Sequence, residues 1–295
     1  MVSKPLTPHI NRSKVRRSFG SSVHTYDAHA VLQREIADRL LAHVQCAKIQ
    51  PRRILDIGCG TGYFTRLLVQ QFKKSSVIAV DLAETMVNHT RSHHPRRLPW
   101  HGKRLHCTAD GCSLPFADAS FDLVTSNLAI QWVDQPDIMM SEMRRVLAPG
   151  GLMLFSTFGR RTLMELRQSL AGISQAHAGL VLPFPDVMTL GDILHALPVE
   201  IPVVDADLFT LTYPDTMALV RELKGIGASS SAIRNRPGGL YGRKLLRDLD
   251  TAYASQHRME DGKLRATFEA LYAQAWYKEP TFQPAGEIIP IMPEA

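Results

Sequence analysis

One short segment constrains the fold of this chain most strongly. Residues 54–57 are an apolar run interrupted by Asp56, and they lead directly into Gly58, Gly60 and Gly62. A short apolar run bounded by a turn signal is typical of a buried parallel strand, and residues 63–72 follow with helical spacing. Glycine lacks a Cβ, so a ligand can approach the backbone of such a turn closely. A strand, a glycine-rich turn and a helix predict an adenosine cofactor at the carboxyl edge of a doubly wound sheet. The alternative is a tight turn without a ligand.

The spacing of the glycines indicates which cofactor binds. A dinucleotide site uses G-x-G-x-x-G, with a helix N-terminus facing the pyrophosphate. This chain has G-x-G-x-G, with Asp56 two residues upstream of the first glycine. That pattern resembles the first motif of methyltransferases that use S-adenosylmethionine (SAM), a ligand with a sulfonium and no phosphate. The turn therefore predicts a SAM site.

Composition excludes several other classes. The chain has 295 residues, 45% of them apolar, which is enough for a sizeable core. No apolar run approaches the ~18 residues that a membrane span needs, so no membrane association is expected. The four cysteines form no C-x-x-C pair and no His/Cys cluster, which predicts reduced thiols, no metal and a cytoplasmic location. The basic N-terminus leaves an organelle-targeting segment as an alternative.

The net charge of +6 is distributed unevenly. No acidic residue lies between Glu84 and Asp110, or between Glu222 and Asp248, and both stretches carry several Lys and Arg residues. Such runs are either solvated surface or a basic face that attracts nucleic acid or an acidic protein. Because aromatic residues are not interleaved with them, a base-stacking platform is not indicated. The charge alone leaves both kinds of partner open, and only the family resemblance given below favours an acidic protein over nucleic acid.

Strand-like and helical segments alternate along the first half of the chain. This alternation predicts an α/β fold with a parallel sheet, an N-terminal helix and a helical insert. The resemblance to SAM methyltransferases implies that the sheet is doubly wound and mostly parallel, with one antiparallel strand. Helix 28–41 is expected to begin at Asp27 as its N-cap. A helix is the alternative for 265–277. Strands are expected at 54–57, 77–81, 105–110, 121–127, 152–157, 207–213 and 265–277.

We expect a single domain with five parts. Residues 1–50, partly disordered to about residue 25, form an N-terminal segment and helix that contribute to a substrate lid. Residues 51–158 form the SAM-binding core, 159–203 a helical insert, 204–279 the remaining core elements, and 280–295 a flexible tail.

Four groups of residues follow successive strands, where ligands bind in open α/β sheets. Asp56 could attract the methionyl ammonium, Asp81 could accept from the ribose diol, and Asp110 from the adenine amine. Residues 127–132 would line the methionine end and the methyl-transfer channel. Each acid alone could instead be a helix cap or part of a surface turn. The predicted cofactor-binding residues are Asp56, Gly58, Gly60, Gly62, Asp81, Leu82, Met86, Asp110, Gly111 and Asn127.

Several further segments resemble one family, the malonyl-acyl carrier protein O-methyltransferases, which belong to the class I (Rossmann-like) SAM methyltransferases. The similarity spans roughly residues 12–277, and the two segments at 126–132 and 223–228 are the most specific. The basic loop around 89–104 and the tail after Glu279 depart from the family pattern. The matching segments are VRRSF at 15–19, YD at 26–27, LQRE at 32–35, LDIGCGTG at 55–62, SNLAIQW at 126–132, FSTFG at 155–159 and LKGIGA at 223–228.

The resemblance implies methylation of the free carboxylate of malonyl-acyl carrier protein, giving the methyl ester that enters pimelate and biotin synthesis. An anionic carboxylate needs no general base, and no base is evident in 127–132. The basic runs would suit docking of an acidic carrier protein. Tyr26 could instead be core packing, and Lys224 a helix C-terminal cation. Candidates for aligning the substrate are Tyr26, Gln131, Trp132, Lys224 and Arg160.

Three alternatives remain at this point. The chain could be a related assembly factor of respiratory complex I with the same fold. It could also be a methyltransferase for a small acid or quinone. A third possibility, from another class, is a SAM- or RNA-binding scaffold without turnover. The intact acids and glycines argue against lost cofactor binding, and the lack of an Asn/Asp-Pro-Pro-Tyr/Phe motif argues against N-methylation.

Overall fold

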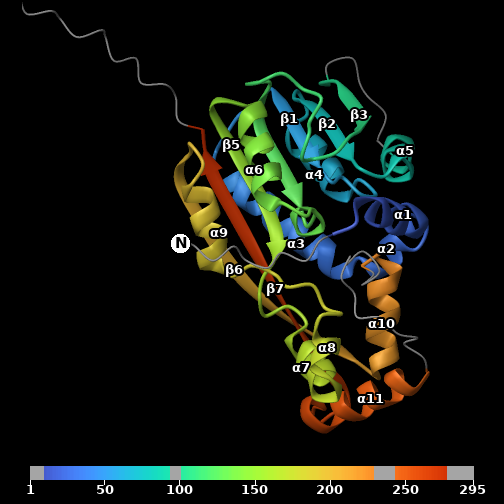
Figure 1. Ribbon diagram of the computed structural model, residues 1–295. Helices are drawn as coiled ribbons and strands as arrows, with labels where there is room; N and C mark the ends of the chain where they lie inside the picture. The colour runs from blue at the N-terminus through green and yellow to red at the C-terminus, as the bar shows by residue number, and fades with distance from the viewer. Residues whose placement is uncertain (1–9, 94–100, 229–242, 278–295) are drawn as a thin grey trace, which may run out of the picture.

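The computed structural model describes residues 10–93, 101–228 and 243–277. Its centre is a seven-stranded sheet in the order β3-β2-β1-β4-β5-β7-β6 (Figure 1). All pairings are parallel except those of β7, which is antiparallel to both β5 and β6. This confirms the predicted sheet. The strands are β1 (Arg53–Ile57), β2 (Ser76–Asp81), β3 (Arg104–Thr108), β4 (Phe121–Asn127), β5 (Leu147–Phe158), β6 (Glu200–Tyr213) and β7 (Leu264–Trp276).

Helices cover both faces of this sheet. Helices α3 and α4 bury apolar side chains on one face, and α6 and α9 bury theirs on the other. Helices α7, α8, α10 and α11 gather beyond one end of the sheet (Figure 1). The helices are α1 (Arg12–Ser22), α2 (Tyr26–His29), α3 (Val31–Cys46), α4 (Tyr63–Gln71), α5 (Glu84–Ser92), η1 (Ile130–Trp132), α6 (Pro136–Val146), α7 (Met164–Ile173), α8 (Gln175–Ala178), α9 (Val187–His195), α10 (Thr216–Gly225) and α11 (Arg243–His257). No helix in these ranges is long and apolar enough to cross a membrane.

The structure confirms the last predicted strand and lengthens the one before it. The helical alternative for 265–277 is wrong, because β7 pairs with a neighbour on each side, and this pairing overrides the helix propensity of its alanines. Strand β6 begins at Glu200 rather than at Asp207, since it pairs with β7 as far as Trp276. Residues 200–204, which include Pro202, gave no alternating pattern from which to predict that extension.

The N-terminal segment is more ordered than expected. Residues 12–22 form α1, which Asn11 caps through its side chain, rather than a disordered stretch. Asp27 is not the N-cap of the long helix: it lies inside α2, and Ala30 precedes α3. Its carboxylate instead accepts a hydrogen bond from Thr61 Oγ1 at 2.6 Å, which ties α2 to the glycine-rich turn. The predicted tail at 280–295 lies outside the described residues.

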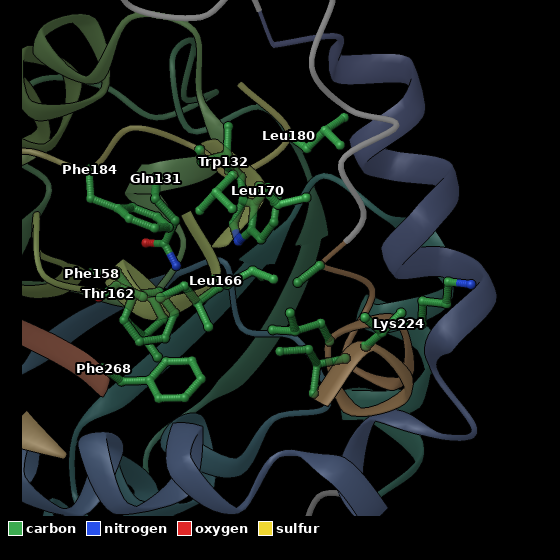
Figure 2. A pocket seen from close by; sticks show the side chains of 18 of the residues that line it. Gln131, Trp132, Phe158, Thr162, Leu166, Leu170, Leu180, Phe184, Lys224 and Phe268 are labelled. Atoms are coloured by element: carbon green, nitrogen blue, oxygen red, sulfur yellow. The ribbon is translucent and has the colours of Figure 1, made fainter. Parts of the chain in front are cut away.

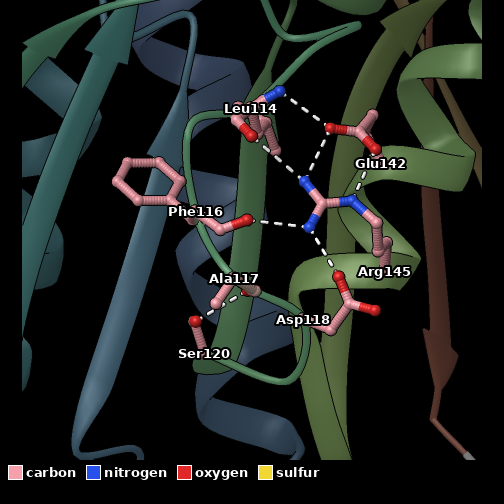
Figure 3. A network of polar contacts seen from close by, with 7 residues as sticks. All are labelled: Leu114, Phe116, Ala117, Asp118, Ser120, Glu142 and Arg145. Atoms are coloured by element: carbon pink, nitrogen blue, oxygen red, sulfur yellow. Dashed lines mark hydrogen bonds and ion pairs between the residues drawn. The ribbon is translucent and has the colours of Figure 1, made fainter.

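A polar network fixes the loop between β3 and β4 (Figure 3). The guanidinium of Arg145 in α6 donates to the carbonyl oxygens of Leu114 and Phe116 and to Asp118, at 2.7–3.1 Å. Glu142 accepts from Arg145 and from the backbone N–H of Leu114. A planar fork of donors can thus satisfy several loop carbonyls at once. The network positions a loop that carries part of the site described next.

Candidate functional site

The carboxyl ends of the strands on either side of the β1–β4 order reversal enclose a first cavity, named here the sheet-edge cavity. Open α/β sheets bind ligands at such a reversal. Its volume is about 100 Å³. It brings together all the predicted cofactor residues except Asp56 and Gly62. The lining residues are Val15, Phe19, Tyr26, Ile57, Gly58, Gly60, Asp81, Leu82, Met86, Ala109, Asp110, Gly111, Asn127, Leu128, Ala129, Trp132, Val133 and Met139.

The glycines of the turn between β1 and α4 serve two purposes: two of them allow close packing, and one leaves open space in the cavity. All three glycines have positive φ. A Cβ on Gly58 would lie 2.2 Å from the Cβ of Ala129, and one on Gly62 would lie 2.7 Å from a Thr90 methyl, so both positions are closely packed. A Cβ on Gly60 would meet nothing within 4 Å. Because Gly60 lines the cavity, this open space suits a ligand that lies against the backbone.

Asp81, at the end of β2, is held in one orientation. One carboxylate oxygen accepts from the N–H of Gly60 at 3.0 Å, and the other from the N–H of Ala83 at 2.8 Å. Burial raises the pKa of Asp81, while these backbone donors favour its charged form and oppose the shift. Each carboxylate oxygen has a second lone pair, so Asp81 can still accept from a diol in the cavity.

Asp110 and Gly111 lie at the opposite side of the same cavity, after β3. Asp110 accepts from the N–H of Cys112 at 2.9 Å and pairs with Arg12 of α1 at 2.6 Å. Both partners are partly exposed, so solvent screens this ion pair. A Cβ on Gly111 would lie 3.1–3.2 Å from Ile57 and Met139, so this position is closely packed against apolar side chains.

Asp56 occupies a different place from the other acids. It is only 1% exposed, does not line the cavity, and accepts a hydrogen bond from Thr65 Oγ1 in α4. Burial raises its pKa to about 7, with a smaller contribution from the charge of Asp81, while the Thr65 bond lowers it. Its contact with any ligand would have to be indirect.

A second cavity, named here the apolar cavity, opens beside the first and has a volume of about 320 Å³ (Figure 2). The two cavities share Phe19, Tyr26, Leu128 and Trp132. The walls of the apolar cavity come from α7, α10, α11, the segment 180–184, strands β5 and β7, and the N-terminal helices. Its lining residues are Phe19, Tyr26, Gln33, Leu128, Gln131, Trp132, Phe158, Thr162, Leu163, Leu166, Leu170, Leu180, Val181, Leu182, Phe184, Val220, Leu223, Lys224, Ile226, Ala228, Leu245, Leu246, Leu249 and Phe268.

The residues after β4 form the boundary between the two cavities. Asn127 accepts from Ser156 Oγ at 2.7 Å and donates to the backbone carbonyl of Gln33 at 3.3 Å. The ring of Trp132 meets that of Phe19 edge-on, with centroids 5.1 Å apart. The Oε1 atom of Gln131 accepts from Thr157 Oγ1 at 3.3 Å. Burial raises the pKa of the Tyr26 hydroxyl, which therefore remains a proton donor.

The predicted substrate residues are only partly brought together. Tyr26, Gln131, Trp132 and Lys224 line the apolar cavity. The ammonium of Lys224 points away from the other labelled side chains in Figure 2. Arg160 does not line the cavity: its side chain is 75% exposed and faces Asp186 at 3.7 Å.

Sequence reasoning missed Gln33 and most of the apolar walls. Gln33 stood within a segment that resembled the family, which was a usable signal. Phe158 also stood within a family-like segment, at 155–159, whereas no local pattern assigned Phe184 or Phe268 to a cavity. They meet only through tertiary packing.

Comparisons with known proteins first define the class. A family model described as a methyltransferase domain matches residues 55–155. The YcgJ protein from Bacillus subtilis aligns with a TM-score of 0.55 at 17% identity, covering 81% of this chain and 98% of that one. A Haemonchus contortus phosphoethanolamine N-methyltransferase aligns at 0.51 and 19%, covering 82% of this chain and 53% of that one. The chain has the fold of class I SAM-dependent methyltransferases. Its methyltransferase domain and the curated relatives described next show that it is an enzyme of that class, with SAM as its cofactor.

Curated relatives define the family within this class. A malonyl-[acyl-carrier protein] O-methyltransferase of Halorhodospira halophila is 43% identical over 267 residues, covering 90% of this chain and 88% of that protein. One from Methylovorus is 42% identical over 270 residues, covering 90% and 89%. The chain belongs to the malonyl-[acyl-carrier protein] O-methyltransferase family.

Proposed function

We propose that this protein transfers the methyl group of SAM to the free carboxylate of a malonyl thioester on acyl carrier protein. The observation that carries the proposal is the junction of two unlike cavities at Tyr26 and Trp132. One has acids and glycines suited to SAM, and the other has apolar walls with no Asp, Glu or His among the described residues that line it. The name shared by relatives more than 40% identical specifies the acceptor.

The cofactor would lie across the sheet edge in an extended form. Asp81 would accept from the ribose hydroxyls, and Gly58 and Gly60 would face the methionyl part. Met86 and Gly111 would flank the adenine, with Asp110 accepting from its amine. Asn127 would face the methionine end, and Asp56 would act on its ammonium through water. The preset orientation of Asp81 supports this arrangement.

The N-terminal segment would form the lid over this cofactor. Helix α1 reaches the adenine side through the Arg12–Asp110 pair. It also reaches the end of α10, where Ser18 Oγ donates to the carbonyl of Gly227 at 2.9 Å. Because α1 contacts both ends, the lid would cover the cofactor and part of the acceptor together.

The chemistry requires alignment rather than proton transfer. A carboxylate oxygen attacks the methyl carbon in line, the carbon–sulfur bond breaks, and its electron pair stays on the sulfur. The products are a methyl ester and S-adenosylhomocysteine, and no proton moves. The described residues that line the apolar cavity include no Asp, Glu or His, which fits an acceptor that is already anionic.

The carrier protein would dock over exposed cations near the mouth of the apolar cavity. Arg160, Arg161, Arg221 and Lys224 are exposed on the elements that surround it. Acyl carrier protein is acidic, so opposite charges would steer its approach. Lys224 would act at this rim rather than at the reacting carboxylate.

The apolar walls also favour a second candidate acceptor, a small apolar acid that would fill the cavity without a carrier protein. Its carboxylate would meet the same boundary residues. The exposed cations at the mouth of the cavity distinguish the two candidates. They would promote methylation of the carrier-protein substrate only, because a small acid would not contact that surface.

The direct test is transfer of labelled methyl from SAM to malonyl-acyl carrier protein. We expect labelling of this substrate and far less of acetyl-acyl carrier protein, which lacks the free carboxylate. Hexanoic and benzoic acids serve as probes of the second candidate. Labelling of neither carrier protein, or equal labelling of both, would contradict the proposal.

A further inference from the structure

Gln33, near the start of α3, is a buried polar side chain whose hydrogen bonding is incomplete. It is 9% exposed and lines the apolar cavity. Its side-chain oxygen Oε1 is buried and has no hydrogen-bond partner among the described residues. An amide offers two donors and an acceptor, and leaving such groups unpaired inside a protein is costly. This arrangement suits a ligand that completes the bonding.

The backbone around Gln33 places it next to the methyl-transfer boundary. Its carbonyl accepts from the amide of Asn127 at 3.3 Å, and Asn127 is itself fixed by Ser156. Asn127 lines the sheet-edge cavity, whereas the side chain of Gln33 lines the apolar cavity. Gln33 is thus held at the point where the two cavities meet.

The other polar groups at this point are also uncharged. The amide oxygen of Gln131 accepts a hydrogen bond from Thr157, which leaves the two N–H donors of Gln131. Lys224 is the one cation among the described residues that line the apolar cavity, and its ammonium points away from these groups. A carboxylate at the boundary would therefore meet neutral donors.

We propose that Gln33 binds the free carboxylate of the acceptor and, with Trp132, orients it for attack. This inference rests on the proposed function. After rotation of its terminal torsion, the Nε2–H group donates to one carboxylate oxygen, and the other oxygen faces the methyl carbon. A neutral donor fixes the carboxylate while leaving it more negative charge than an ion pair would. This rotation exchanges Oε1 and Nε2, so that an N–H donor stands at the buried position without a partner, and the substrate carboxylate accepts from it.

The test compares Gln33→Leu with Gln45→Leu, a control on the same helix at an exposed position. We expect kcat/KM for malonyl-acyl carrier protein to fall about tenfold to a hundredfold in Gln33→Leu, because a hydrogen bond to a charged group is lost. The dissociation constant for SAM should stay within about twofold. The melting temperature should not fall, since an unpaired polar group leaves an apolar site.

A second variant, Gln33→Glu, adds a readout that a merely structural role would not change. Its ionised carboxylate repels the substrate, but its protonated form can donate. Relative to wild type, its activity should therefore recover as the pH falls. Wild-type kinetics in Gln33→Leu, or a lower melting temperature with a pH-independent loss in both variants, would overturn the assignment and leave the proposed function intact. A wild-type enzyme that does not methylate malonyl-acyl carrier protein would overturn both.

Discussion

The sheet-edge cavity and the apolar cavity share Tyr26 and Trp132, yet they are built in different ways. The first is formed by residues that directly follow strands, so backbone hydrogen bonds of the sheet set their positions. The second is lined mainly by apolar side chains from segments far apart in the chain, among them helices α7, α10 and α11, which come together through tertiary packing. The comparison teaches that binding of the methyl donor depends on local turns, whereas binding of the acceptor depends on the tertiary packing of helices such as α7, α10 and α11.

The largest expected effect comes from Gly58→Ala. The new methyl group would meet Ala129 at 2.2 Å with φ near +76°, so the turn must shift. We expect SAM affinity to fall by about a hundredfold or more, because backbone strain and a steric clash add. Isothermal titration with SAM measures this. Gly172→Ala, which meets nothing within 4 Å, is the control, and equal affinities in both variants would show that the turn is not restrictive.

A smaller effect is expected for Asp81→Asn. The variant keeps one acceptor oxygen but replaces the other with a donor and removes the charge. We expect SAM affinity to fall by about tenfold to a hundredfold, with KM for the acyl substrate unchanged at saturating SAM. Asp192→Asn, at an exposed position in α9, is the matched control. A higher KM for the acyl substrate with unchanged SAM affinity would contradict the assignment of SAM to the sheet-edge cavity and of the acyl substrate to the apolar cavity.

Asp56→Asn tests whether this acid acts on the fold or on the ligand. Its pKa is raised from 3.8 to about 7, so the folded protein binds more protons than the unfolded chain between these values. Below pH 4, Asp56 makes its full contribution to the free energy of unfolding. This contribution, which is no more than about 4 kcal/mol, is lost as the pH rises through 7. Between pH 5 and 8, the melting temperature of wild type should therefore decline more steeply than that of the variant. If the melting temperatures of the two proteins changed equally with pH, Asp56 would be excluded as the titrating group.

The smallest effects should come from the rim. Lys224→Ala and Arg160→Ala are each expected to lower kcat/KM for malonyl-acyl carrier protein by about twofold to fivefold, because exposed charges affect association modestly. The loss should disappear at high salt. Lys74→Ala, exposed just before β2 at the opposite edge of the sheet, should have no effect. A large and salt-independent loss would instead place Lys224 at the reacting carboxylate.

The same contrast explains what the sequence could predict. Gly58, Asp81 and Asp110 were predictable because each lies within a few residues of a strand whose apolar run is visible. Asp27 was misjudged, since a helix cap and a side-chain bond to Thr61 give the same local pattern. Phe158 and Leu249 could not be assigned to one cavity, because only the packing of α7 and α11 against the sheet brings them together. Gln33 needed the structure to show its unpaired oxygen.

The most direct test of the central claim is the chemical nature of the transferred methyl group. A carboxyl methyl ester is hydrolysed by mild base, whereas a methyl group on nitrogen or carbon is not. After incubation with labelled SAM and malonyl-acyl carrier protein, mild alkali should release the label as volatile methanol. Label that stays on the carrier protein or its acyl group after this treatment would contradict the account.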